Sequence, residues 1–190
     1  MKFVQKEFSH TYEEKKSKFI AHIFPYDEFD NVMARLKNEH PKGRHHVYAY
    51  RHLNDFDQIV ENSSDDGEPK GTSGKPSLAV LAGAEIINTG VIIVRYFGGI
   101  KLGTGGLVRA YSNSVNKVLN VATLKTYEKL IVKYIECEYN DLSKVEYILN
   151  NLDIKIRNKE FLVNVKLEVH TTKEKLDKLS NELSRNTKLY

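Results

Sequence analysis

The sequence predicts an α+β protein of two domains, residues 1–125 and 126–190, and three observations support this prediction. A chain of 190 residues is long enough for one large domain or two small ones. All 11 glycines lie between Gly43 and Gly106, so the second domain contains none. In that domain the expected elements follow the order β-α-β-β-α, which is the ferredoxin-like split unit without an obvious final strand.

The first domain is expected to begin with alternating strands and helices. Lys18–Pro25 alternates weakly between apolar and polar residues, as a strand does, and Tyr26–Glu39 places its apolar residues on one helical face. His45–Arg51 is expected to be a strand with Tyr48 and Tyr50 on one side. These two rings are half-buried core residues or, alternatively, a surface on which bases stack.

A long, polar surface loop is expected at Asn62–Ser77, which contains three glycines, two prolines and four serines. Its acidic residues Asp65, Asp66 and Glu68 are close enough in sequence to share a divalent cation, and they are equally ordinary turn residues. No EF-hand spacing surrounds them, so no metal site is predicted. The small and apolar residues of Ser77–Asn88 predict a buried helix after the loop.

The rest of the chain is organised around Gly90–Tyr111. Val91–Val94 is a run of four β-branched residues, which predicts a buried strand. Five glycines follow within nine residues, and apolar residues at helical spacing then predict a helix over Leu107–Leu119. Such a segment lets a ligand approach the backbone, and a helix start offers unpaired N–H groups and the positive end of a dipole. The stretch therefore suits an anion such as phosphate.

The candidate residues for binding an anion or RNA lie within this stretch. They are Arg95, Tyr96, Phe97, Gly98, Gly99, Lys101, Gly103, Gly105, Gly106 and Arg109. The alternative is that the glycines only turn the chain or allow a helix to pack closely. The stretch matches neither the P-loop nor the G-x-G-x-x-G pattern, so no nucleotide cofactor is predicted.

The second domain follows a linker expected at Thr123–Tyr127. Its predicted elements are a strand at Lys129–Glu138, a helix at Asp141–Leu152, strands at Ile154–Arg157 and Phe161–Val169, and a helix at Thr171–Leu183. The turn between the last two strands is expected at Asn158–Lys159, and Thr171 or Thr172 is expected to cap the final helix. Lys188–Tyr190 could form only a short edge strand.

Composition narrows the classes of function. The net charge is +4, with 17 basic and 15 acidic residues up to Glu128 and 12 and 10 after it, so the positive excess is mild and even. It permits contact with RNA or the ribosome. The single Cys137 excludes an internal disulfide and a cysteine-based metal site, and no nucleophile–base arrangement is visible. No signal-peptide core and no apolar run approaching ~20 residues is present, so a cytoplasmic protein without membrane contact is expected.

Two segments carry a family resemblance. SDDGEPKGTSGKPSLAVL and VIIVRYFGGIKLGTGGLVRAYSNSV closely resemble the IMPACT (YigZ) family, and the tail looks like the small second domain of its bacterial members. The resemblance implies that the first domain has the fold of the second domain of ribosomal protein S five, with helices on one face of a sheet. It also implies a ferredoxin-like tail. This order is similar to the fourth and fifth domains of elongation factor G, which act on the ribosome.

The family is linked to translation control through its eukaryotic member, and the resemblance therefore implies a translation regulator. We predict that this chain binds RNA or the ribosome without catalysis. Arg95, Lys101 and Arg109 would contact phosphates, and Tyr96 or Phe97 would stack on a base. One alternative is an enzyme or binder of a small phosphorylated ligand, in which the backbone amides of residues 103–107 would hold the anionic group and Asp65, Asp66 or Glu68 would supply a cation or a general base. Another is a module that docks a protein partner.

Overall fold

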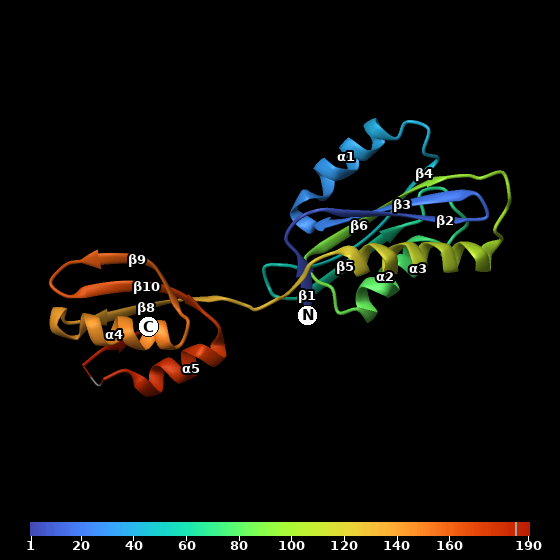
Figure 1. The fold of residues 1–190 in the computed structure, drawn as a ribbon. Coiled ribbons are helices and arrows are strands. Elements are labelled where there is room, and N and C mark those ends of the chain that lie inside the picture. Colours follow the sequence, from blue (N-terminus) through green and yellow to red (C-terminus); the bar gives the residue numbers. More distant parts are fainter. Residues whose placement is uncertain (185) are drawn as a thin grey trace. The chain divides into compact units, whose positions relative to one another are not determined.

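The computed structural model describes residues 1–184 and 186–190, and it divides the chain into two compact units, Met1–Tyr127 and Glu128–Tyr190. Figure 1 shows the mixed α+β composition of each unit. The elements of the N-terminal unit are β1 (Lys2–Val4), β2 (Phe8–Glu14), β3 (Ser17–Pro25), η1 (Tyr26–Glu28), α1 (Phe29–Glu39), β4 (His45–Leu53), β5 (Ile59–Ser64), α2 (Gly74–Gly83), β6 (Thr89–Tyr96), α3 (Thr104–Val121) and β7 (Leu124–Thr126). Those of the C-terminal unit are β8 (Ile131–Cys137), η2 (Tyr139–Asp141), α4 (Leu142–Asn151), β9 (Lys155–Phe161), β10 (Val165–Thr171), α5 (Lys173–Glu182) and β11 (Lys188–Leu189).

Strand β6 occupies the centre of the five-stranded antiparallel sheet, whose order is β2-β3-β6-β4-β5. Its β-branched residues are buried on both faces: Val91 and Ile93 belong to one core, and Ile92 and Val94 to another. A strand covered on both sides reads as a continuous apolar run instead of an alternating one. This explains why the run was recognisable in the sequence and confirms the predicted buried strand.

Helices cover both faces of this sheet. Figure 1 shows α2 and α3 on one face of the sheet and α1 on the other. Helix α1 packs on its face through Val32 and Leu36. The resemblance implied helices on one face only, which is wrong for α1. The second core forms because Phe24, Ile92 and Val94 would otherwise expose apolar area to water.

Two connections differ from the sequence prediction. Helix α2 spans Gly74–Gly83 instead of Ser77–Asn88, and Ile86 and Ile87 are buried in the irregular segment that connects it to β6. The expected linker at Thr123–Tyr127 contains strand β7, which pairs antiparallel with β1. Short segments pair in this way when a distant strand supplies hydrogen-bond partners, and local sequence carries no signal of it.

The C-terminal unit has the ferredoxin-like strand order β11-β8-β10-β9, with all neighbouring pairs antiparallel. Its core includes Cys137, which is buried as a lone core cysteine. The final strand is present, although it consists only of Lys188–Leu189 paired with β8. The turn predicted at Asn158–Lys159 is wrong, because those polar residues lie within the exposed edge strand β9 and the chain turns at 162–164. Thr172 caps α5 by accepting the Lys175 N–H, as predicted.

Candidate functional site

The loop between β5 and α2 is ordered by the side chain of Asp65. Asp65 Oδ1 accepts hydrogen bonds from the Ser73 and Gly74 N–H groups and from Ser73 Oγ, at 3.0, 2.8 and 2.7 Å, and Oδ2 accepts the Gly71 N–H at 2.7 Å. Burial raises the pKa of this carboxyl, but the hydrogen bonds from Ser73 and the backbone outweigh that effect and hold the pKa below its ordinary value. The expected surface loop is therefore a folded segment in which Thr72 and Ser73 are buried.

The next carboxylate fastens the same loop to strand β4. Asp66 Oδ2 accepts the His46 N–H at 2.6 Å, and the Asp66 carbonyl oxygen lies 2.8 Å from His45 Nδ1. These contacts position Glu68, two residues further along the loop, over the main sheet.

Glu68 is buried against one residue of the central strand and one of the long helix. Its Oε1 accepts a hydrogen bond from Arg95 Nη1 at 2.5 Å and another from the Tyr111 hydroxyl at 2.8 Å. His45 Nε2 lies 3.9 Å from the same oxygen. Burial, followed by the negative charge of Glu68, raises the pKa of Tyr111 far above its ordinary value, so the hydroxyl remains a donor. The loop motif thus joins β6 to α3 through a shared carboxylate.

The guanidinium of Arg95 is buried between two aromatic rings. Its Cζ lies 5.5 Å from the centroid of Phe19 and 5.7 Å from that of Phe97. Arg95 Nε is buried and has no hydrogen-bond partner within the described part of the chain. Most buried polar atoms are hydrogen-bonded, so this donor is an exception that needs an explanation.

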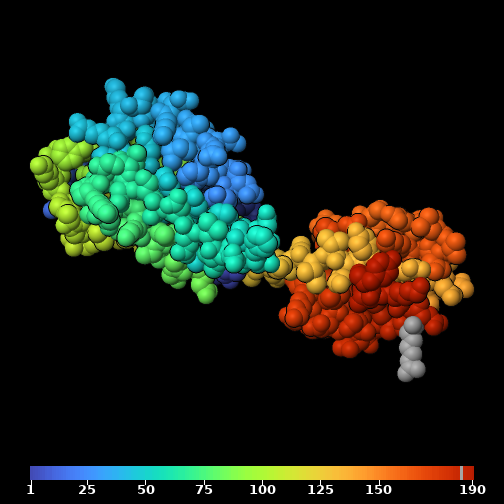
Figure 2. All heavy atoms as spheres, turned by 180° about the vertical axis from the view of Figure 1, so that it is seen from behind, coloured from blue at the N-terminus to red at the C-terminus, as the bar shows by residue number. Residues whose placement is uncertain are grey.

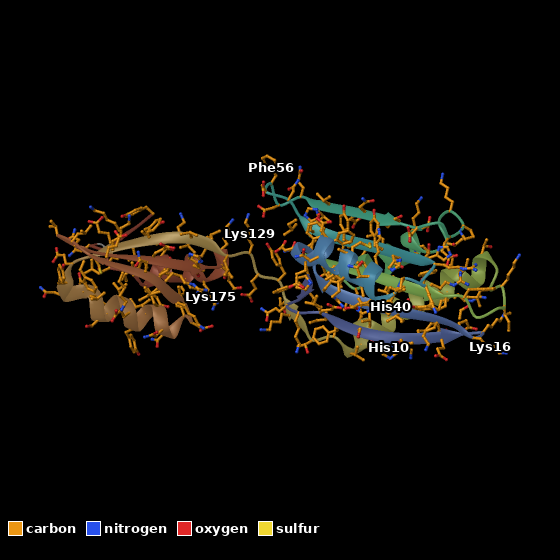
Figure 3. The ribbon with its side chains drawn as sticks, turned by 90° about the horizontal axis from the view of Figure 1, so that it is seen from above. His10, Lys16, His40, Phe56, Lys129 and Lys175 are labelled. Atoms are coloured by element: carbon orange, nitrogen blue, oxygen red, sulfur yellow. The ribbon has the colours of Figure 1, made fainter. Side chains whose placement is uncertain are left out.

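The glycine-rich segment after β6, Gly98–Gly106, needs its individual glycines for different structural reasons. A Cβ on Gly98 would lie 2.0 Å from the carbonyl carbon of Lys16, because the two segments touch backbone to backbone. Lys16 is labelled at the end of the β2–β3 hairpin in Figure 3. Gly99 and Gly103 have φ values of +87° and +72°, which L side chains rarely adopt.

Helix α3 begins directly after Gly103 with no side-chain cap. The first helical hydrogen bond beyond this point runs from the Leu107 N–H to the Gly103 carbonyl at 2.9 Å. The N–H groups of Thr104, Gly105 and Gly106 are therefore those that a helix start leaves without an intrahelical acceptor. They carry the positive end of the α3 dipole.

A pocket of about 450 Å³ lies between this helix start and the acidic loop, which is the segment 65–73 between β5 and α2 that contains Asp65, Asp66 and Glu68. Its lining residues are Arg44, His45, Glu68, Pro69, Arg95, Phe97, Lys101, Leu102, Gly103, Thr104 and Leu107. In Figure 2 the yellow-green atoms of the glycine-rich segment border the green atoms of the acidic loop on the N-terminal unit. Basic side chains and a helix N-terminus thus surround a hollow with an apolar wall, and this arrangement can hold an anionic group attached to an apolar or aromatic body.

The predicted binding residues divide into four groups. Arg95, Phe97, Lys101 and Gly103 line the pocket. Gly98 and Gly99 shape the loop before it, and Gly105 and Gly106 form the first turn of α3. The remaining two, Tyr96 and Arg109, lie elsewhere.

The side chain of Tyr96 lies on the face of the sheet opposite the pocket. Its hydroxyl lies 2.9 Å from Nδ1 of His40, the residue that directly follows α1 and is labelled in Figure 3. Successive residues of a strand point to opposite faces, so Arg95 and Tyr96 cannot share one site. Arg109 lines a separate hollow of about 110 Å³ with Glu14 and Lys15.

Arg44 and His45 are pocket residues that the sequence analysis missed. His45 lies opposite Arg95 in the register between β4 and β6, and the Arg44 N–H donates to the Arg95 carbonyl at 3.2 Å. The pairing of β4 with β6 joins segments about fifty residues apart, so no local sequence pattern predicts it.

The carboxylates of Asp65, Asp66 and Glu68 each accept hydrogen bonds from other residues of this chain, as described above. Within residues 1–184 and 186–190, no three His, Cys, Asp or Glu side chains are grouped so that they could hold a metal ion. Nor does any described helix combine the length and apolar character needed to cross a membrane.

Comparisons with known proteins match both units. Residues 15–119 match the Impact N-terminal domain family, and residues 135–188 match a domain of unknown function, DUF1949. An IMPACT family member from Haemophilus influenzae is 34% identical over 90% of this chain and 84% of its own length. The IMPACT family member YigZ from Escherichia coli is 38% identical over 90% of this chain and 85% of its own. A crystal structure of a hypothetical protein superimposes with a TM-score of 0.64 at 35% identity, covering 99% of this chain and 95% of the other.

Proposed function

This chain belongs to the IMPACT family, and from that membership and its pocket we propose that it is a cytoplasmic, non-enzymatic regulator of translation that binds RNA or the ribosome. The translational part of the proposal rests on the role in translation control that the family resemblance implies. The RNA part rests on the pocket between the glycine-rich segment and the acidic loop. A phosphate of the RNA would lie at the start of α3.

The observation that carries the proposal is the position of two exposed cations at this pocket. The charge of Arg95 is matched by Glu68 within a hydrogen-bonded pair, whereas Arg44 and Lys101 line the same pocket with exposed side chains. The uncapped start of α3 adds a partial positive charge from its free N–H groups. The local field therefore favours a phosphate, and each neutralised phosphate would release counterions.

The apolar wall of the pocket supports a nucleotide over an isolated inorganic anion. Phe97 is 43% exposed although it lies directly after the buried strand β6. Stacking on an aromatic side chain stabilises a single-stranded base by about 1–3 kcal/mol. A phosphate at α3 and a base on Phe97 would use the polar and apolar sides of the pocket together.

Co-sedimentation of the full chain with purified ribosomes tests the proposal. Lys101→Ala should reduce the bound fraction, because it removes a cation that lines the pocket. Lys117→Ala is the matched control, because it removes an exposed lysine from α3 outside the pocket and should leave binding unchanged. Equal binding by the wild type and both variants would count against this site, and no binding by the wild type would count against the function.

A small phosphorylated ligand is a second candidate, and the pocket volume favours it. About 450 Å³ falls within the range of roughly 300–1,000 Å³ typical of small-molecule sites. Nucleoside monophosphates should then raise the melting temperature of the wild type and do so less for Lys101→Ala. Stabilisation by a monophosphate without any retention of RNA would favour this candidate over the first.

A further inference from the structure

A second pocket lies on the other face of the main sheet, remote in sequence from the glycine-rich segment. It has a volume of about 270 Å³ and is lined by Tyr26, Asp27, Phe29, Asp30, Tyr48 and Tyr50. Four of these six residues are aromatic and the other two are carboxylates. The rings come from η1, the first turn of α1 and strand β4.

The four rings form a contiguous aromatic surface. Tyr48 and Tyr50 lie two positions apart on the same face of β4, with ring planes 5° apart and centroids separated by 6.1 Å. Phe29 packs edge-to-face against both, at 5.2 and 5.3 Å. The centroid of the Tyr26 ring lies 4.9 Å from that of Tyr50 and 3.9 Å from that of His52. The stacking on His52 fixes the orientation of the Tyr26 ring.

The two carboxylates give this surface its charge. Asp27 and Asp30 are exposed, and no ion pair is formed by either of them within the described residues. Burial, Tyr50 and then the charges of Asp30 and Asp27 raise the pKa of Tyr26, which agrees with carboxylates near its ring. Negative charge beside ring faces is the opposite of what an RNA backbone needs, so base stacking on Tyr48 and Tyr50 is disfavoured here.

We propose that this pocket binds a weakly hydrated organic cation, a quaternary ammonium or guanidinium group, between its tyrosine rings and beside Asp27 and Asp30. The negative faces of aromatic rings attract such cations, and the attraction increases when the cation is easily desolvated. The cation could belong to a free small molecule or to a modified lysine or an arginine side chain of a protein. Both sources share the chemistry that the pocket recognises.

The first test compares choline with its neutral carbon isostere 3,3-dimethylbutanol, using NMR signals of the tyrosine rings in the full chain. Choline should shift the signals of Tyr26, Tyr48 and Tyr50 in a saturable way, and the isostere should not. Equal shifts with both probes would overturn the proposal, because they would indicate a merely apolar hollow. An absence of saturable shifts with every probe, including those named below, would overturn it as well.

The second test uses a matched pair of variants at one ring. Tyr48→Phe keeps the aromatic face and should bind choline as the wild type does, whereas Tyr48→Leu should bind roughly two- to thirty-fold more weakly. Asp30→Asn should weaken binding roughly two- to five-fold, as expected for one exposed charge. Unchanged NMR signals from β2 and α3, which belong to the same unit but do not line this pocket, would show that each variant remains folded. Equal affinity of the two Tyr48 variants would contradict a role for the ring.

The third test distinguishes the two sources of the cation. N-acetyl-trimethyllysine amide and N-acetylarginine amide carry the same groups on a peptide-like body. Tighter binding of either one than of choline identifies a protein side chain as the ligand, and tighter binding of choline identifies a free small molecule. None of these measurements involves Lys101, so their outcome is independent of whether the chain binds RNA.

Discussion

Arg95 and Glu68 form a buried ion pair between residues 27 positions apart, with Arg95 Nη1 donating to Glu68 Oε1 at 2.5 Å. The pair connects the central strand to the acidic loop, and Tyr111 extends it to helix α3. The two family-like segments of the sequence therefore meet in one hydrogen-bonded cluster below the pocket. Arg95 and Glu68 thus help to build the pocket, and in the proposed function its exposed side chains contact the ligand.

Removal of one member of this pair should destabilise the N-terminal unit. Glu68→Ala is expected to lower the free energy of unfolding by about 3–5 kcal/mol, because it leaves the Arg95 charge buried and unpaired. Urea unfolding followed by NMR signals of Met1–Tyr127 measures the effect. The double variant Arg95→Met with Glu68→Leu should be less destabilised than the sum of its single variants. Strict additivity would show that the two residues do not interact.

Asp65 should stabilise the loop in a manner that depends on pH. Asp65→Asn is expected to lower the free energy of unfolding by about 1.5–3 kcal/mol near neutral pH, because it weakens charge-assisted hydrogen bonds to backbone amides. The pKa of Asp65 is lowered in the folded state relative to its ordinary value of 3.8. The contribution is therefore complete above that value and is lost as the pH falls through the lower, folded pKa.

The difference in unfolding free energy between the wild type and Asp65→Asn should accordingly be constant near neutral pH and shrink below pH 3.8. Asp55→Asn is the control, because Asp55 is an exposed aspartate in the turn before β5. It should change stability by less than about 0.5 kcal/mol at any of these pH values. A difference for Asp65→Asn that grows in acid would have the wrong sign for a carboxyl with a lowered pKa.

Two glycines should respond oppositely to the same substitution. Gly98→Ala places a Cβ against the backbone of Lys16 and should destabilise the unit by about 1–3 kcal/mol or more. Gly83→Ala places a Cβ in open space at the end of α2 and should stabilise it by up to about 1 kcal/mol. The melting temperatures of both variants and of the wild type, measured by thermal unfolding in the same buffer, test this prediction. A melting temperature for Gly98→Ala at or above that of the wild type would refute the close backbone contact.

Much of the fold could be predicted because local patterns report it. The β-branched run predicted β6, and the helical spacing of Leu107 and the residues after it predicted α3. The boundaries of α2 could not be predicted, because Asp65 binds Gly74 from nine positions away and thereby helps to place the helix start. The short strands β7 and β11 depend on distant partners in the same way.

The candidate site was predictable only in part. Sequence indicated Lys101 and Gly103, which lie in the glycine-rich segment and line the pocket. The partnership of Arg44 with them depends on the pairing of β4 with β6, which is non-local. The sequence could have excluded Tyr96 from the same site as Arg95, because successive residues of a strand lie on opposite faces of the sheet.

The salt dependence of RNA binding tests the central proposal most directly. Affinity of the full chain for a short single-stranded RNA should be measured between about 50 and 200 mM salt for the wild type, Arg44→Ala, Lys101→Ala and the control Lys117→Ala. Each pocket variant should bind more weakly and lower the slope of log affinity against log salt by about 0.7, the value expected for one lost phosphate contact. The control should retain the wild-type slope. Slopes for Arg44→Ala and Lys101→Ala equal to that of the wild type would contradict phosphate binding at this pocket.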